Sequence, residues 1–83
     1  MDWIKGLQRS IDYIEEHLTE TIDYKSVAAQ GFSSSYHFQR VFGILCGFTV
    51  GEYIRNRRLS LAGTELAAGN AKVIDIALKY SYE

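Results

Sequence analysis

Apolar residues recur at helical spacing along most of the chain, and this periodicity constrains the fold more than any other feature. It is clearest at the beginning, where apolar side chains stand three or four positions apart at Trp3, Leu7, Ile11, Ile14 and Leu18. Such a stripe predicts an amphipathic helix over residues 2–18. The chain also contains no proline, the residue that most often interrupts a helix. The sequence therefore predicts an all-α fold.

Length and composition limit the chain to one small folded unit. Its 83 residues, of which 47% are hydrophobic, are typical of a globular domain and argue against disorder. A single cysteine excludes an internal disulfide framework, and no Cys/His cluster suggests a zinc site. No apolar run reaches the roughly 18 residues of a membrane-spanning helix, and the start of the chain is unlike a signal peptide. These features predict a cytoplasmic protein and indicate no cofactor or metal.

Charge is distributed unevenly along the chain, although the net value is only −1. Residues 1–23 hold six acidic and two basic side chains, for a net charge of −4. Residues 24–63 hold five basic side chains and one acidic one, for a net charge of +4. A local basic region is typical of a protein that binds nucleic acid. A solvated basic helix face is the alternative that charge alone leaves open.

Residues 23–31 predict a short helix followed by a tight turn. Asp23 is the predicted N-cap of this helix. Gly31 is expected to end it by adopting a positive φ angle. Between them, the small side chain of Ala28 allows another helix to approach closely. A short helix and a turn of this kind form the first half of a helix-turn-helix motif.

The next helix, predicted over residues 35–46 between Ser34 as N-cap and Gly47 as its end, has two different faces. Its predicted core face carries Phe38, Val41, Phe42 and Leu45. Its other face carries Tyr36, Gln39, Arg40 and Gly43. Arginine can donate two hydrogen bonds to guanine, and glutamine can bond adenine bidentately. The pattern predicts a helix-turn-helix whose second helix enters a DNA groove, with Tyr36 as core filler the alternative.

The remaining residues predict a long helix and the start of a second, similar unit. Thr49 and Glu52 form a predicted capping box that opens a helix over residues 50–68. Its apolar contacts are expected from Tyr53, Ile54, Leu59, Ala62 and Leu66. Residues 72–80 form a last predicted helix, with one side made of Val73, Ile76, Ala77 and Tyr80. The pairs Val27-Ala28 and Ile76-Ala77 make a faint repeat, which divides the chain into a first unit (1–49), a linker helix (50–69) and the start of a second unit (70–83).

These residues resemble the DNA-binding domain of the AraC/XylS family of transcription regulators, which has two helix-turn-helix units joined by a long helix. The matching positions span residues 22–83 and are Ala28, Ser34, Tyr36, His37, Phe38, Arg40, Phe42, Gly47, Thr49, Tyr53, Arg58, Ala62, Leu66, Val73, Ile76, Ala77 and Tyr82. The resemblance implies a bacterial transcription activator with a homeodomain-like three-helix unit, a linker helix and the first helix of a second unit. Because the chain stops before a second recognition helix, we expect a fragment of a longer regulator.

The match to the family is incomplete at two positions of the first unit. The family usually has glycine at the Phe32 position, but here the glycine is one residue earlier, at Gly31. A lysine usually follows the Phe42 position, and Gly43 replaces it. The first difference leaves the turn geometry open, and the second removes one expected phosphate contact.

By resemblance, Tyr36, Gln39 and Arg40 reach base edges in the major groove. Ser34 and Ser35, with the amides at the start of their helix, suit phosphate oxygens. Arg55 and Arg57 are candidate phosphate contacts, with solvated arginines as the alternative. The expected structural residues are Gly47, Thr49, Glu52 and Arg58. Of these, Arg58 matches a family position that implies a brace between the two units, through a carboxylate or carbonyls.

The predicted partners are double-stranded DNA and, for an activator, RNA polymerase. The apolar side of the last helix also predicts a homodimer. The alternative function is a helical self-association or effector-domain interaction module that does not bind DNA appreciably in this form. An enzyme is not expected, because the sequence has no Gly-rich phosphate loop, no paired carboxylates and no nucleophile at a recognisable distance from a base.

Overall fold

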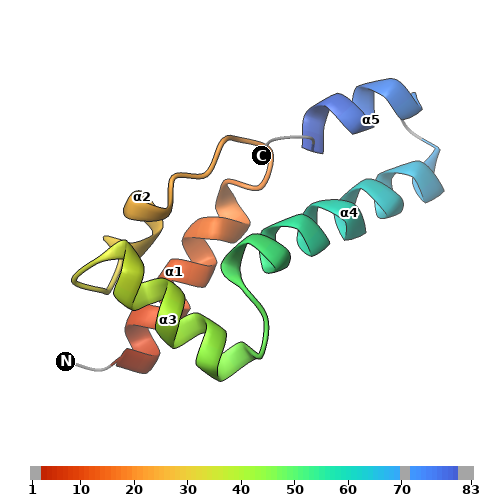
Figure 1. Ribbon diagram of the computed structural model, residues 1–83. Helices are drawn as coiled ribbons and strands as arrows, with labels where there is room; N and C mark the ends of the chain where they lie inside the picture. The colour runs from red at the N-terminus through yellow and green to blue at the C-terminus, as the bar shows by residue number, and fades with distance from the viewer. Residues whose placement is uncertain (1–2, 70–71, 81–83) are drawn as a thin grey trace.

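Five helices make up the part of the chain that the computed structural model describes, residues 3–69 and 72–80. They are α1 (Trp3–Glu16), α2 (Tyr24–Ala28), α3 (Ser35–Cys46), α4 (Val50–Ala68) and α5 (Val73–Tyr80). No strand forms among these residues, and the predicted all-α fold is confirmed (Figure 1). Asp2, at which the first predicted helix begins, and Tyr82, which is part of the family match, lie outside the described residues.

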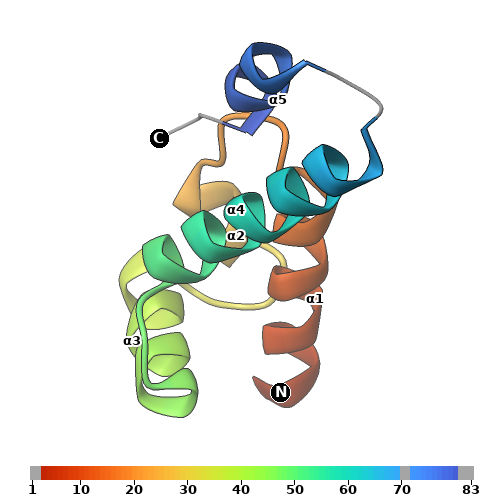
Figure 2. The same ribbon diagram turned by 90° about the vertical axis from the view of Figure 1, so that its right-hand side faces the viewer.

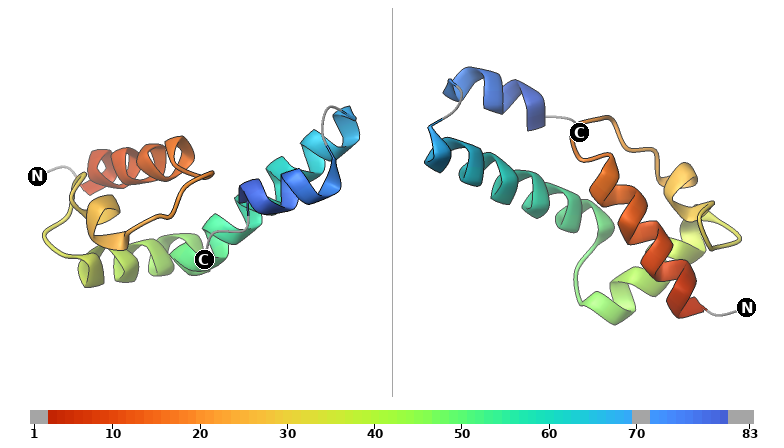
Figure 3. Two further views of the ribbon diagram at one scale, coloured as in Figure 1. Left: turned by 90° about the horizontal axis from the view of Figure 1, so that it is seen from above. Right: turned by 180° about the vertical axis from the view of Figure 1, so that it is seen from behind.

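The helices form an elongated molecule with principal extents of 44, 21 and 18 Å. Helices α1, α2 and α3 gather at one end, and α4 leads away from them (Figure 1). Figure 2 shows α1 and α3 descending on the two sides of this three-helix unit. Helix α5 lies beside α4 (Figure 3). None of the described helices is both long and apolar enough to cross a membrane.

Local capping interactions place the helix ends close to where the sequence predicts them. The Asp23 carboxylate accepts a hydrogen bond from the Lys25 amide at 3.1 Å. The Ser34 hydroxyl accepts one from the His37 amide at 3.0 Å. Glycines end α3 and α4 in the left-handed conformation, with φ angles of 78° at Gly47 and 70° at Gly69. These side chains and glycines satisfy backbone groups that the helix ends leave open.

The start of α4 has the predicted capping box. Thr49 Oγ1 accepts a hydrogen bond from the Glu52 amide at 3.0 Å, and the Glu52 carboxylate accepts one from the Thr49 amide at 2.8 Å. Each side chain thus satisfies an amide of the other residue. Because Val50 and Ile54 follow directly and are buried, the box sets the point at which α4 enters the core of the three-helix unit.

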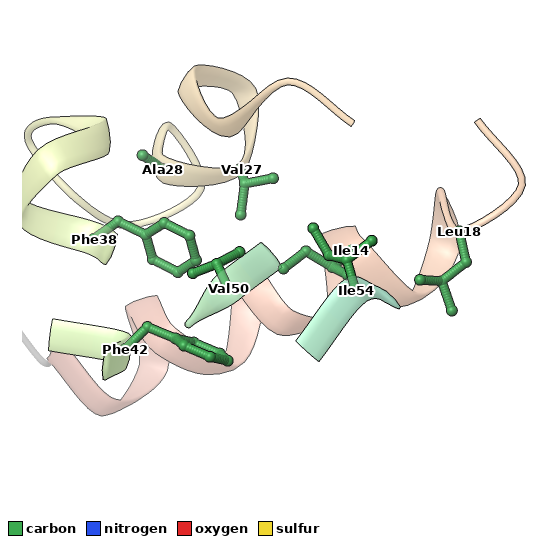
Figure 4. Packing of buried hydrophobic residues seen from close by; sticks show 8 residues of the cluster. All are labelled: Ile14, Leu18, Val27, Ala28, Phe38, Phe42, Val50 and Ile54. Atoms are coloured by element: carbon green, nitrogen blue, oxygen red, sulfur yellow. The ribbon is translucent and has the colours of Figure 1, made fainter. Parts of the chain in front are cut away.

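The core lies where α1, α2, α3 and the first turns of α4 meet (Figure 4). Its buried residues are Ile14, Leu18, Val27, Ala28, Phe38, Phe42, Val50 and Ile54. Phe38 and Phe42 are fully buried, and their ring centroids lie 5.9 Å apart. Offset and tilted aromatic contacts of this kind add to the stabilisation from apolar burial. These two rings therefore hold α3 in a defined orientation on the rest of the unit.

Helix α1 buries most of its predicted apolar stripe, together with two small residues beside that stripe. Its buried residues are Gly6, Ser10 and Ile14, whereas Trp3 is about half exposed. Ser10 is fully buried because its hydroxyl donates a hydrogen bond to the Val27 carbonyl at 3.0 Å. Small residues at positions 6 and 10 let α1 approach α2, while Leu7, Ile11, Ile14 and Leu18 of the predicted stripe pack in or against the core.

Gly31 has a different role from the predicted one. It does not adopt a positive φ angle, which among the described residues occurs only at Gly47 and Gly69. Instead, a Cβ atom at Gly31 would lie 2.3 Å from Gly6 Cα. Because no carbon atom tolerates such a distance, the absence of a side chain is needed for backbone contact rather than for a special conformation.

Several apolar residues that were predicted to be buried are exposed. Leu45 is 49% exposed, whereas Phe42, one turn earlier, is fully buried and contacts the rings of Phe48 and Tyr53. Leu59 and Leu66 of α4 are also exposed. Of the apolar side predicted for α5 (Val73, Ile76, Ala77 and Tyr80), which was expected to be available for self-association, only Ile76 is buried, at 2% exposure. Helix α5 therefore touches α4 along a narrow line, supported by an ion pair between Lys79 and Glu65 at 2.7 Å.

Candidate nucleic-acid interface

The outer face of α3 presents the three side chains that the sequence predicts to read bases. Tyr36 is 72% exposed, and Gln39 and Arg40 are exposed beside it. The opposite face of the helix is held by Phe38 and Phe42, both fully buried. Tyr36 as core filler is thereby ruled out. The result is one polar, cationic and aromatic face on a helix whose orientation the core determines.

Two hydrogen bonds within α3 order this face. Arg40 Nη1 donates to the Tyr36 hydroxyl at 3.4 Å, and Gln39 Nε2 donates to the Ser35 hydroxyl at 2.9 Å. Both pairs are four residues apart, the spacing at which side chains are neighbours on a helix. A guanidinium has five N–H donors and an amide has two, so each side chain retains donors for another molecule.

Serines at the start of α3 place hydrogen-bonding groups beside the exposed face. Ser34 caps the helix, and Ser35 is its first residue. Amides at a helix N-terminus carry partial positive charge and attract anions. The ring of His37, one turn further on, packs edge-on against Phe32 with a centroid distance of 5.6 Å. His37 therefore supports the turn between α2 and α3.

Arg57 has a partner that the sequence analysis did not identify. Its Nε and Nη2 donate to the two carboxylate oxygens of Glu15, at 2.9 and 2.7 Å. The Tyr53 hydroxyl donates to the same carboxylate at 2.7 Å. These bonds join α1 to α4 in a bidentate arrangement that a planar guanidinium favours. Glu15 lies 42 residues from Arg57, so no local pattern in the sequence could have paired them.

The electrostatics of this cluster follow from the same contacts. Hydrogen bonds from Arg57 hold the pKa of the Glu15 carboxyl below its usual value, while partial burial works in the opposite direction. Burial, followed by the hydrogen bond to Glu15, raises the pKa of Tyr53 to about 12. Glu15 is therefore ionised and Tyr53 neutral at neutral pH, which is the arrangement that lets all three side chains bond.

Arg58 is buried, with only 6% of its surface exposed. Its Nε donates to the Leu18 carbonyl at 2.9 Å, and its Nη2 donates to the Glu20 carbonyl at 2.7 Å. The sequence analysis expected Arg58 to brace the two units against each other. These two bonds tie α4 to the segment that follows α1, since Leu18 and Glu20 both belong to the first unit. The brace between the two units stays a prediction.

Arg55 remains exposed on α4. It lies near Glu52, whose pKa is lowered mainly by its hydrogen bonds with Thr49 and to a smaller extent by the charge of Arg55. The structure thus separates the three arginines of α4: Arg57 and Arg58 are bound within the chain, and Arg55 faces solvent. Within the described ranges, no three His, Cys, Asp or Glu side chains come together in a way that could hold a metal ion.

Comparison with known proteins places this arrangement in a family. No protein-family model matches the chain, but individual proteins do. The regulatory protein SoxS of Salmonella typhimurium is 37% identical over 76 residues, which are 92% of this chain and 71% of SoxS. The chain belongs to the AraC/XylS family of transcription regulators. The predicted family membership is confirmed.

Other members of the AraC/XylS family match over similar lengths of this chain. The HTH-type transcriptional activator AarP of Providencia stuartii is 42% identical over 71 residues, or 86% of this chain and 53% of AarP. The uncharacterized HTH-type transcriptional regulator YbfP of Bacillus subtilis is 39% identical over all 83 residues, which make up 28% of YbfP. The chain thus spans about half of AarP and about a quarter of YbfP. The relatives are transcriptional regulators, so transcription regulation, and not catalysis, is the function of this family.

Proposed function

We propose that this chain is a sequence-specific DNA-binding module and that α3 is its recognition helix, lying in the major groove of double-stranded DNA. One observation carries the proposal: Tyr36, Gln39 and Arg40 are all exposed on one face of α3, while Phe38 and Phe42 fix its other face in the core. A recognition helix needs this combination, because base contacts require side chains that project from a rigidly placed element.

Each of the three exposed side chains has a chemically suitable base contact. Arg40 donates to the O6 and N7 atoms of guanine, Gln39 bonds the N6 and N7 atoms of adenine, and Tyr36 contacts a thymine methyl group. The hydrogen bond from Arg40 to Tyr36 already restricts the Arg40 side chain, so Arg40 loses less conformational entropy when it binds DNA. One good bidentate contact contributes about 1–3 kcal/mol of discrimination between bases.

Phosphate contacts come from the serine-capped start of α3 and from α4. Ser34, Ser35 and the neighbouring amides bond the DNA backbone beside the recognition helix. Arg55 is the α4 arginine that serves this role, because it is exposed. Arg57 is reassigned from phosphate contact to support of α4, since its guanidinium is held bidentately by Glu15.

Substitution of Arg40 tests the base-reading role directly. A duplex selected from a randomised library by the unmodified chain is the probe, and fluorescence anisotropy gives the dissociation constant. Arg40→Ala is expected to weaken binding by about 1–3 kcal/mol and to relax selectivity at one base pair. Arg9→Ala, which removes an exposed arginine from α1, is the charge-matched control and leaves binding unchanged. Equal affinity of the Arg40→Ala variant for the selected duplex would exclude the proposed role.

We extend the proposal to transcription activation in the bacterial cytoplasm, which involves further partners. AarP is described as a transcriptional activator, and for a similar role of this chain we propose RNA polymerase as a second partner. A homodimer through α5 is supported by the exposure of Val73, Ile74 and Leu78 on that helix. Apolar side chains grouped in this way favour an interface. Ile74→Glu should abolish self-association in light scattering, and a monomer at high concentration of the unmodified chain would reject the dimer.

A further inference from the structure

The inner face of α3 rests on a row of aromatic rings. Phe42 is fully buried, and its ring centroid lies 5.9 Å from that of Phe38, which points into the same core (Figure 4). Two rings from beyond α3 also contact Phe42: Phe48 at 5.9 Å, from the loop after α3, and Tyr53 at 5.6 Å, from the first turn of α4. Phe38 continues the row to Phe32, 5.4 Å away. Because protein interiors are close-packed, one ring of such a row moves only if its neighbours move with it.

Tyr53 is the ring of this row that carries a hydrogen-bonding group. Its hydroxyl donates to the Glu15 carboxylate on α1 at 2.7 Å. Arg57 donates to both oxygens of the same carboxylate, at 2.9 and 2.7 Å, and so holds the acceptor in place. Hydrogen bonds to an ionised acceptor are stronger than those between neutral groups. The orientation of the Tyr53 ring, at 66° to the plane of the Phe42 ring, is therefore determined from α1.

A change at the inner face of α3 reaches its outer face. Phe42 lies on the same helix as Tyr36, Gln39 and Arg40, which are exposed on the other side. A helix moves as a unit, so a rotation at Phe42 turns the three exposed side chains by the same angle. Side chains of a binding site must be held within about 0.5 Å and 10–20° of their bound geometry. A small reorientation of the Tyr53 ring is therefore enough to disturb base contacts.

We propose that Tyr53 is a positioning residue for base recognition, and that its hydroxyl bond to Glu15 fixes the ring that orients Phe42 and, with it, α3. The inference rests on the proposed function of α3 and adds to it a specificity-determining residue on α4. A residue that only stabilises the fold affects binding to every duplex alike, through the folded fraction. A misplaced α3 weakens binding to the selected duplex and spares binding to a random duplex, which depends on phosphate contacts.

Tyr53→Phe tests the inference, because it keeps the ring and removes only the hydroxyl. Fluorescence anisotropy gives the dissociation constants for the selected duplex and for a random duplex of equal length, under conditions in which circular dichroism shows a folded protein. The selectivity ratio of the two constants should fall roughly fivefold or more, the lower end of what one bidentate base contact contributes. Tyr13→Phe, at a partly buried tyrosine of α1, is the matched control and leaves the ratio unchanged. An unchanged ratio in folded Tyr53→Phe overturns the proposal.

Substitutions of Glu15 test the same bond from its other end. Glu15→Gln keeps an oxygen that accepts from the Tyr53 hydroxyl, whereas Glu15→Ala removes it. Only Glu15→Ala should therefore lower the selectivity ratio. The variant that combines Glu15→Ala with Tyr53→Phe should lose no more selectivity than Glu15→Ala alone, because both changes remove one interaction. Additive losses, or equal losses in Glu15→Gln and Glu15→Ala, would contradict the assignment.

Amide chemical shifts of the free protein separate a failure of this inference from a failure of the proposed function. Tyr53→Phe should move amide signals along the whole of α3, including Tyr36 at its start. Changes confined to the surroundings of Tyr53 would reject the positioning role, whatever the chain binds. Changes along α3 in a chain whose unmodified form binds every duplex equally would support the orientation of α3 by Tyr53 and reject base recognition by α3.

Discussion

Replacement of Gly31 by alanine tests the backbone contact that joins α1 to the turn before α3. The added Cβ atom would lie 2.3 Å from Gly6 Cα and 3.0 Å from the Gly6 carbonyl carbon and oxygen. Carbon atoms in van der Waals contact lie about 3.5–4.0 Å apart, so the two segments must separate by roughly 1 Å or more. Both partners are backbone, so no side chain can rotate away to relieve the overlap.

The separation also affects contacts next to the glycine pair. Ser10 lies one turn further along α1, and its hydrogen bond to the Val27 carbonyl is 3.0 Å long. A displacement of roughly 1 Å stretches this bond beyond a useful length, and a buried hydroxyl then loses its acceptor. Overpacking costs about 1–3 kcal/mol, and a lost buried hydrogen bond adds about 1 kcal/mol. We expect Gly31→Ala to lose about 2–4 kcal/mol of unfolding free energy.

Urea unfolding followed by circular dichroism measures this loss, and Gly43→Ala provides the matched control. Gly43 is within α3, and a Cβ atom there would meet nothing within 4 Å. Alanine stabilises an open helical position by about 1 kcal/mol relative to glycine. The same substitution should therefore have opposite effects at the two sites. A Gly31→Ala protein as stable as the Gly43→Ala protein would show that the helices do not depend on this contact.

Three further substitutions test the supports of α4 and α3. Arg57 holds the pKa of Glu15 below its usual value. Glu15→Gln should therefore lower the free energy of unfolding by about 1 kcal/mol at pH 7. In a pH series of melting curves, this difference should disappear as the pH falls through the pKa of Glu15 in the folded protein. Arg58→Ala leaves two carbonyls without these donors and should cost about 2–4 kcal/mol in urea unfolding; a loss below that range would show that water replaces the guanidinium. Gly47→Ala, at a φ of 78°, should lower the melting temperature by an amount equivalent to about 1 kcal/mol, and an unchanged value would mean that α3 ends in another way.

Helix limits could be predicted from the sequence because they depend on neighbouring residues. Ser34 lies three residues before the amide that it caps, and Thr49 and Glu52 are equally close. Gly47 ends α3 because it adopts a conformation that other residues avoid. The exposed face of α3 could be predicted for a similar reason, since Phe38 and Phe42 repeat at helical spacing and leave Tyr36 on the other side.

The interactions that hold the helices together could not be predicted in this way. Arg57 and Glu15 lie 42 residues apart, and Ser10 bonds a carbonyl 17 residues away. Gly31 was predicted to adopt a positive φ angle, yet glycine is needed there because the backbone of Gly6 packs against it. Leu45 continued an apolar pattern that no other helix covers. In each case the outcome depends on which surfaces of distant helices meet.

Sequence alone thus determined the five helices, the N-caps of α2, α3 and α4, the family and the side chains on the outer face of α3. Tertiary structure alone decided that Arg57 supports α4, that Arg55 faces solvent, and that a groove lies between α4 and α5. The division has a physical cause. Capping and periodicity act over three or four residues and can be recognised along the chain, whereas an ion pair, a glycine contact or a groove exists only once helices distant in sequence are packed together.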